Sequence, residues 1–143
     1  MTLPDPEDHA RRFARVRAAH QTELAEDYVE MIADLIAEQG EARGADLAVR
    51  FGVTAATVAN TLARLKRDGL VEMKRYRSIF LTPQGEAMAS QSRERHRAVV
   101  AFLLALGVSQ ETADLDAEGL EHHLSEETLD RMRSFTEGKR VAE

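Results

Sequence analysis

Residues 42–69 contain the pattern that most constrains the fold: two short helical segments separated by a glycine. The segment ARGADLAVRFGV, at 42–53, is ended by Gly52, and TAATVANTLARLKRDG, at 54–69, begins with Thr54 and ends with Gly69. Threonine is a favoured N-cap residue, and glycine is common just after the last turn of a helix. Two short helices joined by a tight turn predict a helix-turn-helix.

Two short strand patterns follow directly. LVEM lies at 70–73 and SIFLT at 78–82, with KRYR between them at 74–77. Short runs of this kind around a polar tip predict a β-hairpin. A helix-turn-helix followed by a hairpin is a winged helix, so we expect a mainly α-helical protein with a small β-hairpin wing.

The segment before the winged helix has helical periodicity. Its apolar residues predict a helix from about Asp8 to Gln39, ended by Gly40. The pattern allows one continuous helix or two helices with a break near His20.

Helical patterns also follow the wing. A long helix is predicted from Pro83, a first-turn residue, to a stop at Gly107. Ser109 is expected to cap a short helix that covers the EGLEHH run at 118–123, and Ser125 to begin the last helix.

The charge of the chain is unevenly distributed. The 143 residues have a formal net charge of −6, yet residues 41–80 hold 8 basic and 4 acidic residues, against 4 and 9 in residues 1–40 and 7 and 12 in residues 81–143. The basic segment coincides with the predicted winged helix, which indicates contact with the phosphates of DNA. A basic patch that only keeps the protein in solution is the alternative.

The second helix of the helix-turn-helix is expected to enter a major groove of double-stranded DNA. The residues on its groove side are Thr54, Ala55, Thr57 and Asn60. Ala55 or a threonine methyl suits a thymine methyl group, and Asn60 suits adenine. Phosphate contacts are expected from Arg64 in the same helix and from Lys74, Arg75 and Arg77 at the wing tip.

Cysteine is absent, so a metal site in this chain must use oxygen and nitrogen ligands. AEGLEHHLS places Glu118, Glu121 and His122 at positions i, i+3 and i+4, which on a helix share one face. That face suits a cation, although a solvated acidic helix end is the simpler explanation.

Two further positions add to this pattern. Asp27 and Glu30 are three residues apart in the first helix, beside its apolar stripe, and His96 lies in the long helix after the wing. Taken alone, the acidic pair is more often surface charge and His96 is more often a histidine at the edge of the core.

Together these features resemble the manganese transport regulators (MntR) of the diphtheria-toxin-repressor superfamily. The resemblance covers about residues 23–135. It depends on DYVEMI at 27–32, the winged helix at 41–82, RERH at 93–96, LGVS at 106–109 and DAEGLEHHLSEETLD at 116–130.

The resemblance implies a metal site and its residues. The family's metal ligands correspond to Asp27, Glu30, His96, Glu118, Glu121 and His122. Iron-responsive relatives have sulfur residues where this chain has Asp27 and Glu118, and hard carboxylates favour Mn(II). Four carboxylates and two imidazoles suffice for two Mn(II) ions per chain that share bridging carboxylates.

The resemblance also implies the domain organisation. We expect a winged helix-turn-helix DNA-binding domain at residues 1–82, in which 1–20 form an N-terminal extension, and a helical metal-binding and dimerisation domain at 83–143. One winged-helix domain contacts few base pairs, so a homodimer on a pseudopalindromic operator is expected.

We interpret the chain as a Mn(II)-dependent transcriptional repressor of manganese homeostasis rather than an enzyme, with the metal as co-repressor. An iron-responsive repressor of the same superfamily, a dinuclear metal hydrolase and a metal-independent winged-helix regulator are the alternatives. The sequence lacks a secretory signal and a run of roughly 18 apolar residues, so we expect a cytoplasmic protein without a membrane partner.

Overall fold

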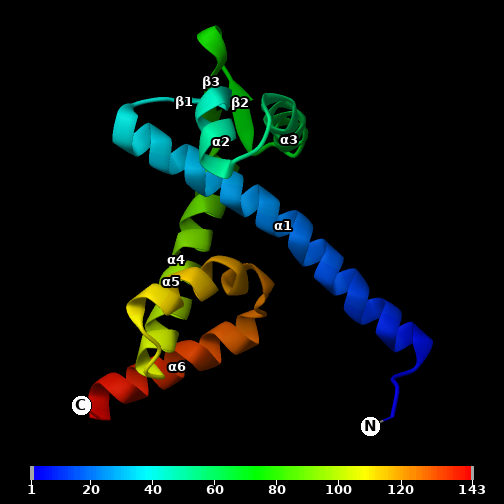
Figure 1. Ribbon diagram of the computed structural model, residues 1–143, viewed down its shortest axis with the longest axis vertical. Coiled ribbons are helices and arrows are strands. Elements are labelled where there is room, and N and C mark those ends of the chain that lie inside the picture. The colour runs from blue at the N-terminus through cyan, green and yellow to red at the C-terminus, as the bar shows by residue number, and fades with distance from the viewer. Residues whose placement is uncertain (1, 143) are drawn as a thin grey trace. The chain divides into compact units, whose positions relative to one another are not determined.

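The computed structural model describes residues 2–142, without the side chains of Tyr76, Val141 and Ala142 (Figure 1). These residues form two compact units. One comprises Ala25–Arg93, and the other comprises the chain up to Leu24 together with the chain from Glu94 onward. The boundaries fall inside two long helices, α1 and α4. Among the described residues, no helix combines the length and apolarity needed to cross a membrane.

Helix α1 runs without a break from Pro6 to Gln39, so the alternative of two helices separated near His20 is wrong. It ends at Gly40, whose positive φ of 85° is a conformation that glycine adopts readily. In the second half of the helix, Tyr28, Val29 and Ile32 are almost completely buried. Their spacing forms the apolar stripe that packs against the winged helix.

The helix-turn-helix consists of α2 (Gly44–Phe51) and α3 (Ala55–Arg67). As expected, Gly52 between them has a left-handed backbone, and the Thr54 hydroxyl accepts a hydrogen bond of 3.1 Å from the backbone N–H of Thr57. The buried face of α3 carries Val58, Leu62 and Leu65. These three side chains leave the opposite face of the helix in solvent.

The wing is formed by β2 (Val71–Met73) and β3 (Ser78–Leu81), joined by the 3-10 turn η1 (Arg75–Arg77). The two strands pair antiparallel, with Val71 opposite Leu81. A third strand, β1 (Ala42–Arg43), pairs with β3 and gives the order β1-β3-β2. The sequence pattern does not predict β1, because two residues are too short for a strand pattern and gain their partner only in the folded chain.

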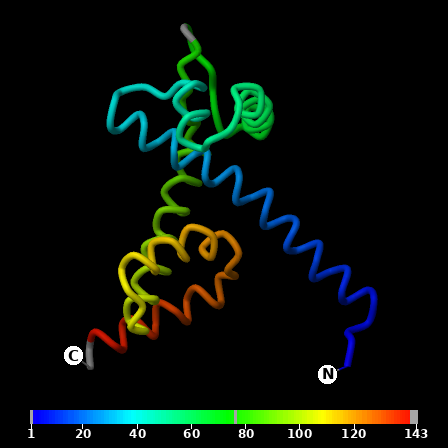
Figure 2. The backbone as a smooth tube through the Cα atoms, viewed as in Figure 1, coloured from blue at the N-terminus to red at the C-terminus, as the bar shows by residue number. Residues whose placement is uncertain are grey.

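The second unit contains four segments after the wing: the remainder of α4 (Pro83–Ala105), α5 (Gln110–Leu120), the 3-10 turn η2 (Glu121–His123) and α6 (Glu126–Ala142) (Figure 2). Val99, Ala117 and Leu129, from three of these helices, form its small core. The predicted caps are confirmed, since Ser109 and Ser125 accept hydrogen bonds from the backbone N–H groups three residues later.

Candidate metal centre and DNA-reading surface

The expected DNA-reading residues of α3 are exposed on one unit of the structure. Thr54, Ala55, Thr57, Asn60 and Arg64 all lie in solvent, on the side of the helix opposite Val58. The Thr54 hydroxyl already caps the helix and also donates to the Thr57 hydroxyl over 3.0 Å. Asn60 and Arg64 therefore have more freedom than Thr54 to contact bases or phosphates.

The wing carries the other expected DNA contacts. Lys74, Arg75 and Arg77 are exposed around η1. Lys74 Nζ lies 4.8 Å from the centre of the Phe80 ring, a cation–π contact that directs its ammonium group along the wing. Arg77 has a positive φ of 63°, which turns the chain sharply into β3.

Three of the predicted metal ligands meet in the helical unit. His96 comes from α4, Glu118 from α5 and Glu121 from η2. The His96 Nδ1 atom lies 3.0 Å from Glu121 Oε2 and 4.0 Å from Glu118 Oε1. The Glu118 side chain is exposed, whereas only 1% of the Glu121 side chain reaches solvent.

His122 extends this cluster on the buried side. Its side chain is fully enclosed, and Nε2 lies 3.3 Å from Glu121 Oε1. The buried carboxylate of Glu121 thus contacts one imidazole with each oxygen. Burying a carboxylate is costly unless positive charge or hydrogen bonds compensate it, and a divalent cation supplies such compensation.

The expectation that the helix capped by Ser109 covers the whole EGLEHH run at 118–123 is wrong. Helix α5 ends at Leu120, and the next three residues form the 3-10 turn η2. A 3-10 turn has 3.0 residues per turn instead of 3.6 and changes the direction in which side chains point. Glu118 is exposed whereas Glu121 and His122 are buried, and the carboxylates of Glu118 and Glu121 still lie beside the same histidine, His96.

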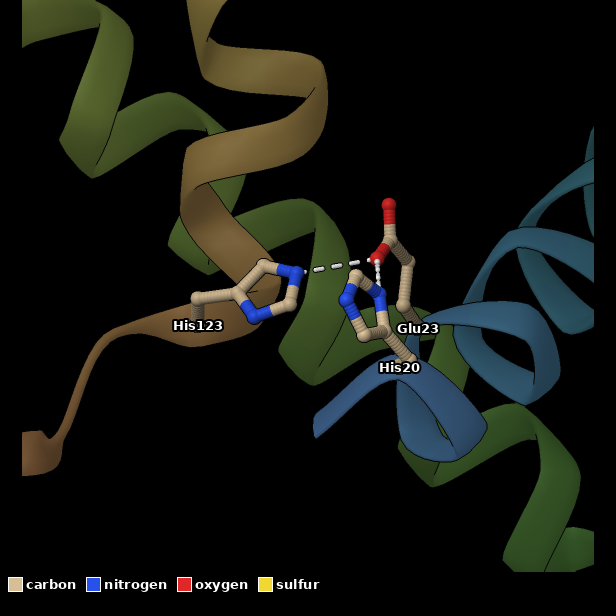
Figure 3. Close-up of side chains that lie close together, drawn as sticks. All are labelled: His20, Glu23 and His123. Atoms are coloured by element: carbon tan, nitrogen blue, oxygen red, sulfur yellow. Dashed lines mark hydrogen bonds and ion pairs between the residues drawn. The ribbon is translucent and has the colours of Figure 1, made fainter. Parts of the chain in front are cut away.

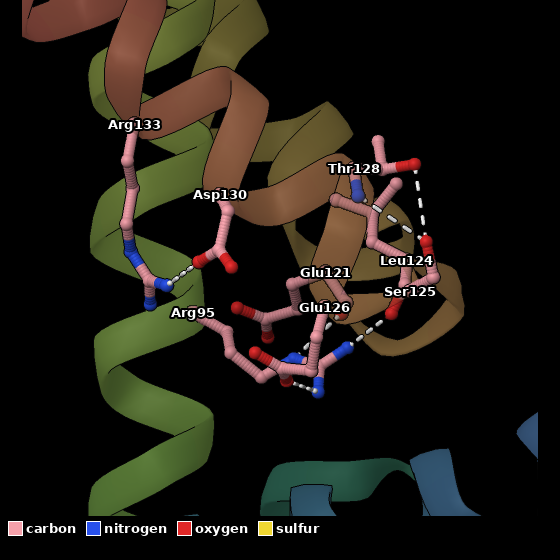
Figure 4. A network of polar contacts seen from close by, with 8 residues as sticks. All are labelled: Arg95, Glu121, Leu124, Ser125, Glu126, Thr128, Asp130 and Arg133. Atoms are coloured by element: carbon pink, nitrogen blue, oxygen red, sulfur yellow. Dashed lines mark hydrogen bonds and ion pairs between the residues drawn. The ribbon is translucent and has the colours of Figure 1, made fainter.

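Arg95 holds η2 in this conformation (Figure 4). Its guanidinium donates to the backbone carbonyls of Glu121 and Leu124, over 3.2 and 2.6 Å, and to the Glu126 carboxylate over 3.3 Å. One side chain of α4 therefore satisfies carbonyl groups at the end of α5 and η2. No sequence pattern indicates this role, because the carbonyl groups concerned lie 26 and 29 residues away.

The remaining predicted ligands, Asp27 and Glu30, lie on α1 within the other unit, and both are partly buried. Their spacing of three residues places them on neighbouring positions of one helix face. All six predicted ligands present oxygen or nitrogen atoms, a donor set that fits Mn(II).

A second cluster was not predicted from the sequence (Figure 3). Glu23 Oε2 lies 2.9 Å from His123 Nε2 and 3.4 Å from His20 Nδ1. Burial raises the pKa of Glu23, but the hydrogen bond with His123, the charges of His122 and His123, and the hydrogen bond with His20 together hold the pKa below its usual value. The spacing of His20 and Glu23 on α1 was the one available signal, and their partner is about a hundred residues away.

The fold and the clusters define a winged-helix protein whose additional helical unit carries buried metal-ligating side chains. Residues 20–79 match the family described as iron dependent repressor, N-terminal DNA binding domain, and residues 82–141 match its metal binding and dimerisation domain. Transcriptional regulator MntR of Escherichia coli O157:H7 is 56% identical over 135 residues, which cover 94% of this chain and 87% of that protein.

Solved structures agree with this assignment. A manganese-dependent transcriptional repressor in complex with manganese superposes with a TM-score of 0.71 at 30% identity, over 79% of this chain and 52% of that one. IdeR of T. acidophilum superposes with a TM-score of 0.66 at 28% identity, over 76% and 52%. The chain thus spans about half the length of these solved proteins. The chain belongs to the MntR family of the diphtheria-toxin-repressor superfamily.

Proposed function

We propose that this protein is a Mn(II)-dependent transcriptional repressor that binds an operator as a homodimer and controls manganese homeostasis in the cytoplasm. The observation that carries the proposal is the buried Glu121 carboxylate between the imidazoles of His96 and His122. The similarity to MntR proteins over nearly the whole chain also supports the proposal.

We propose six ligands for the metal: Asp27, Glu30, His96, Glu118, Glu121 and His122. Four carboxylates and two imidazoles provide enough donor atoms for two Mn(II) ions per chain, with carboxylates shared between them. When bound, Mn(II) supplies positive charge that the clustered carboxylates lack. The exposed Glu118 offers an oxygen on the solvent side, and the buried Glu121 and His122 hold the inner side of the site.

The proposal also explains how metal binding affects DNA binding. The six residues come from α1 and from the segments after the wing, so their coordination couples metal occupancy to the conformation of the chain. DNA affinity then rises with the fraction of chains that hold metal, a coupling between two sites of one molecule. The match of residues 20–79 to a DNA binding domain and the similarity to transcriptional regulators disfavour the hydrolase.

The test is operator binding in the presence of different metals. A fragment from a manganese-transporter promoter is titrated with the metal-free protein plus Mn(II), Fe(II), Zn(II) or chelator, under anaerobic conditions. We expect Mn(II) to promote binding and chelator to abolish it. Equal binding with chelator would overturn the metal dependence, and activation by Fe(II) alone would favour the iron-responsive alternative.

A single substitution tests the proposed basis of metal selectivity. Asp27→Met replaces a hard oxygen by a thioether, so Mn(II) should become a weaker activator relative to Fe(II) and Co(II). The same operator titration measures this order for the wild type and the variant. An unchanged order would show that the other ligands set the selectivity.

A further inference from the structure

His20, Glu23 and His123 form a cluster of metal-ligating side chains that shares no residue with the six proposed manganese ligands (Figure 3). Two of its residues lie near the middle of α1 and the third belongs to η2. All three lie in the same compact unit. The Glu23 carboxylate is the common partner of both imidazoles.

The geometry of the cluster suits a single cation. One potential ligand atom from each side chain lies within 4.8 Å of the other two. Bonds of about 2.0–2.2 Å to a tetrahedral Zn(II) place neighbouring ligand atoms about 3.3 Å apart. The distances of 2.9 and 3.4 Å from Glu23 to the two rings bracket that value. The rings themselves are nearly perpendicular, with centroids 5.0 Å apart, so small side-chain rotations close the site.

The cluster is also accessible. The His20 side chain is 64% exposed, and those of His123 and Glu23 are 30% and 26% exposed. A cation therefore reaches it without opening the core, and water can complete the coordination shell.

We propose that His20, Glu23 and His123 bind one late first-row divalent cation, represented here by Zn(II), with a ligand set that includes none of the six residues proposed for manganese. Two imidazoles with one carboxylate suit Zn(II) or Co(II) better than Mn(II), which favours oxygen-rich sites. The bound cation joins the middle of α1 to His123 of η2, the residue that follows His122 in the chain. The N-terminal extension thereby gains a role that the sequence did not indicate.

Zn(II) binding by the metal-free full-length chain tests the proposal. Native mass spectrometry counts the ions bound, and calorimetry gives their affinities, for the wild type and for His20→Ala. Because His20 is exposed, its truncation should leave the fold intact, which circular dichroism verifies. We expect His20→Ala to bind one Zn(II) fewer per chain, or to bind that ion at least tenfold more weakly. Zn(II) held by the six manganese ligands is common to both proteins and cancels in the difference.

The chain offers a matched control in His9, another histidine of the N-terminal half of α1, whose ring packs on Phe13. His9→Ala should bind Zn(II) like the wild type. Equal Zn(II) stoichiometry and affinity for the wild type and His20→Ala would overturn the proposal. An equally large loss of Zn(II) binding in His9→Ala would also overturn the proposal.

Glu23→Gln separates a metal site from a simple hydrogen-bonded cluster. The amide retains an oxygen that accepts from both rings but lacks the charge that a cation requires. We expect the variant to keep its helical content and to lose the same Zn(II) ion as His20→Ala. Retention of that ion at wild-type affinity would show that the cluster only connects α1 to η2. Mn(II)-dependent operator binding is measured separately on His20→Ala and should persist. Failure of the Zn(II)-site proposal is therefore distinguishable from failure of the proposed repressor function.

Discussion

At the scale of single residues, Glu121 is the most completely buried carboxylate of the proposed metal centre. Its carboxylate is nearly inaccessible to solvent and contacts His96 and His122 through different oxygens. We therefore expect Glu121 to be essential for Mn(II) binding, in contrast to an exposed glutamate such as Glu111 on α5.

Glu121→Gln should therefore abolish Mn(II)-dependent operator binding and weaken Mn(II) binding by about tenfold or more, because it removes a charged ligand while preserving side-chain volume. Electron paramagnetic resonance of free Mn(II) during a titration measures the affinity. Glu111→Gln is the matched control and should behave as the wild type. Wild-type Mn(II) affinity in Glu121→Gln would place the cation elsewhere.

At the scale of elements, the 3-10 turn η2 depends on contacts from another helix. Arg95 of α4 donates to two carbonyl groups of this region and to Glu126, whereas Arg133 of α6 pairs with Asp130 one turn away (Figure 4). Arg95 thus positions Glu121 and His122. The surface ion pair between Arg133 and Asp130 contributes little to stability.

Arg95→Ala should lower Mn(II) affinity by roughly 10- to 100-fold, the range typical of residues that orient metal ligands. Arg133→Ala should leave the affinity unchanged. Titration of both variants with Mn(II) checks this, with circular dichroism to confirm the helical content. A similar affinity in the two variants would mean that η2 keeps its conformation without Arg95.

The wing and α3 should contribute to DNA binding in different ways. Arg75→Ala, at the wing tip, should weaken binding to all sequences about equally and lower the slope of log K against log salt by about 0.9, the effect of one phosphate contact. Asn60→Ala, on the exposed face of α3, should instead change the preference among operator variants. Fluorescence anisotropy over a salt series distinguishes these effects, and the reverse pattern would mean that the two surfaces have exchanged roles.

At the scale of the whole molecule, the helical unit leaves large apolar side chains in solvent. Leu106 is 54% exposed and Phe135 is 44% exposed, although Phe135 also stacks edge-on against Phe102. The core of this unit is small and the unit matches a metal binding and dimerisation domain, so we expect a second copy of the chain to cover these side chains.

We expect the protein to be a homodimer at micromolar concentration with or without metal, because burial of these apolar side chains does not depend on the cation. Sedimentation velocity of the metal-free protein measures the mass. Phe135→Glu should shift the equilibrium toward monomer, whereas Val49→Glu, at an exposed position on α2 of the winged helix, serves as the control. A metal-free wild-type monomer would contradict the prediction.

Much of this protein was predictable because its signals are local. Several features depend only on residues within one or two helical turns, and the structure confirms them. They are the helix ends at Gly40 and Gly52, the caps at Thr54, Ser109 and Ser125, and the apolar stripe of α3. The spacing of the acidic residues and histidines suits a metal site, and only the resemblance to the MntR family favours that site over a solvated acidic surface.

Tertiary structure decided the features that depend on distant partners. Strand β1 exists through its pairing with β3, and η2 replaces the expected helix where Arg95 meets the carbonyls of Glu121 and Leu124. Glu23 faces His123 only because the chain returns to α1 one hundred residues later. A sequence pattern records spacing along one element, whereas these contacts arise from the packing of several elements, and that packing determines which carboxylates are buried and which imidazoles they meet.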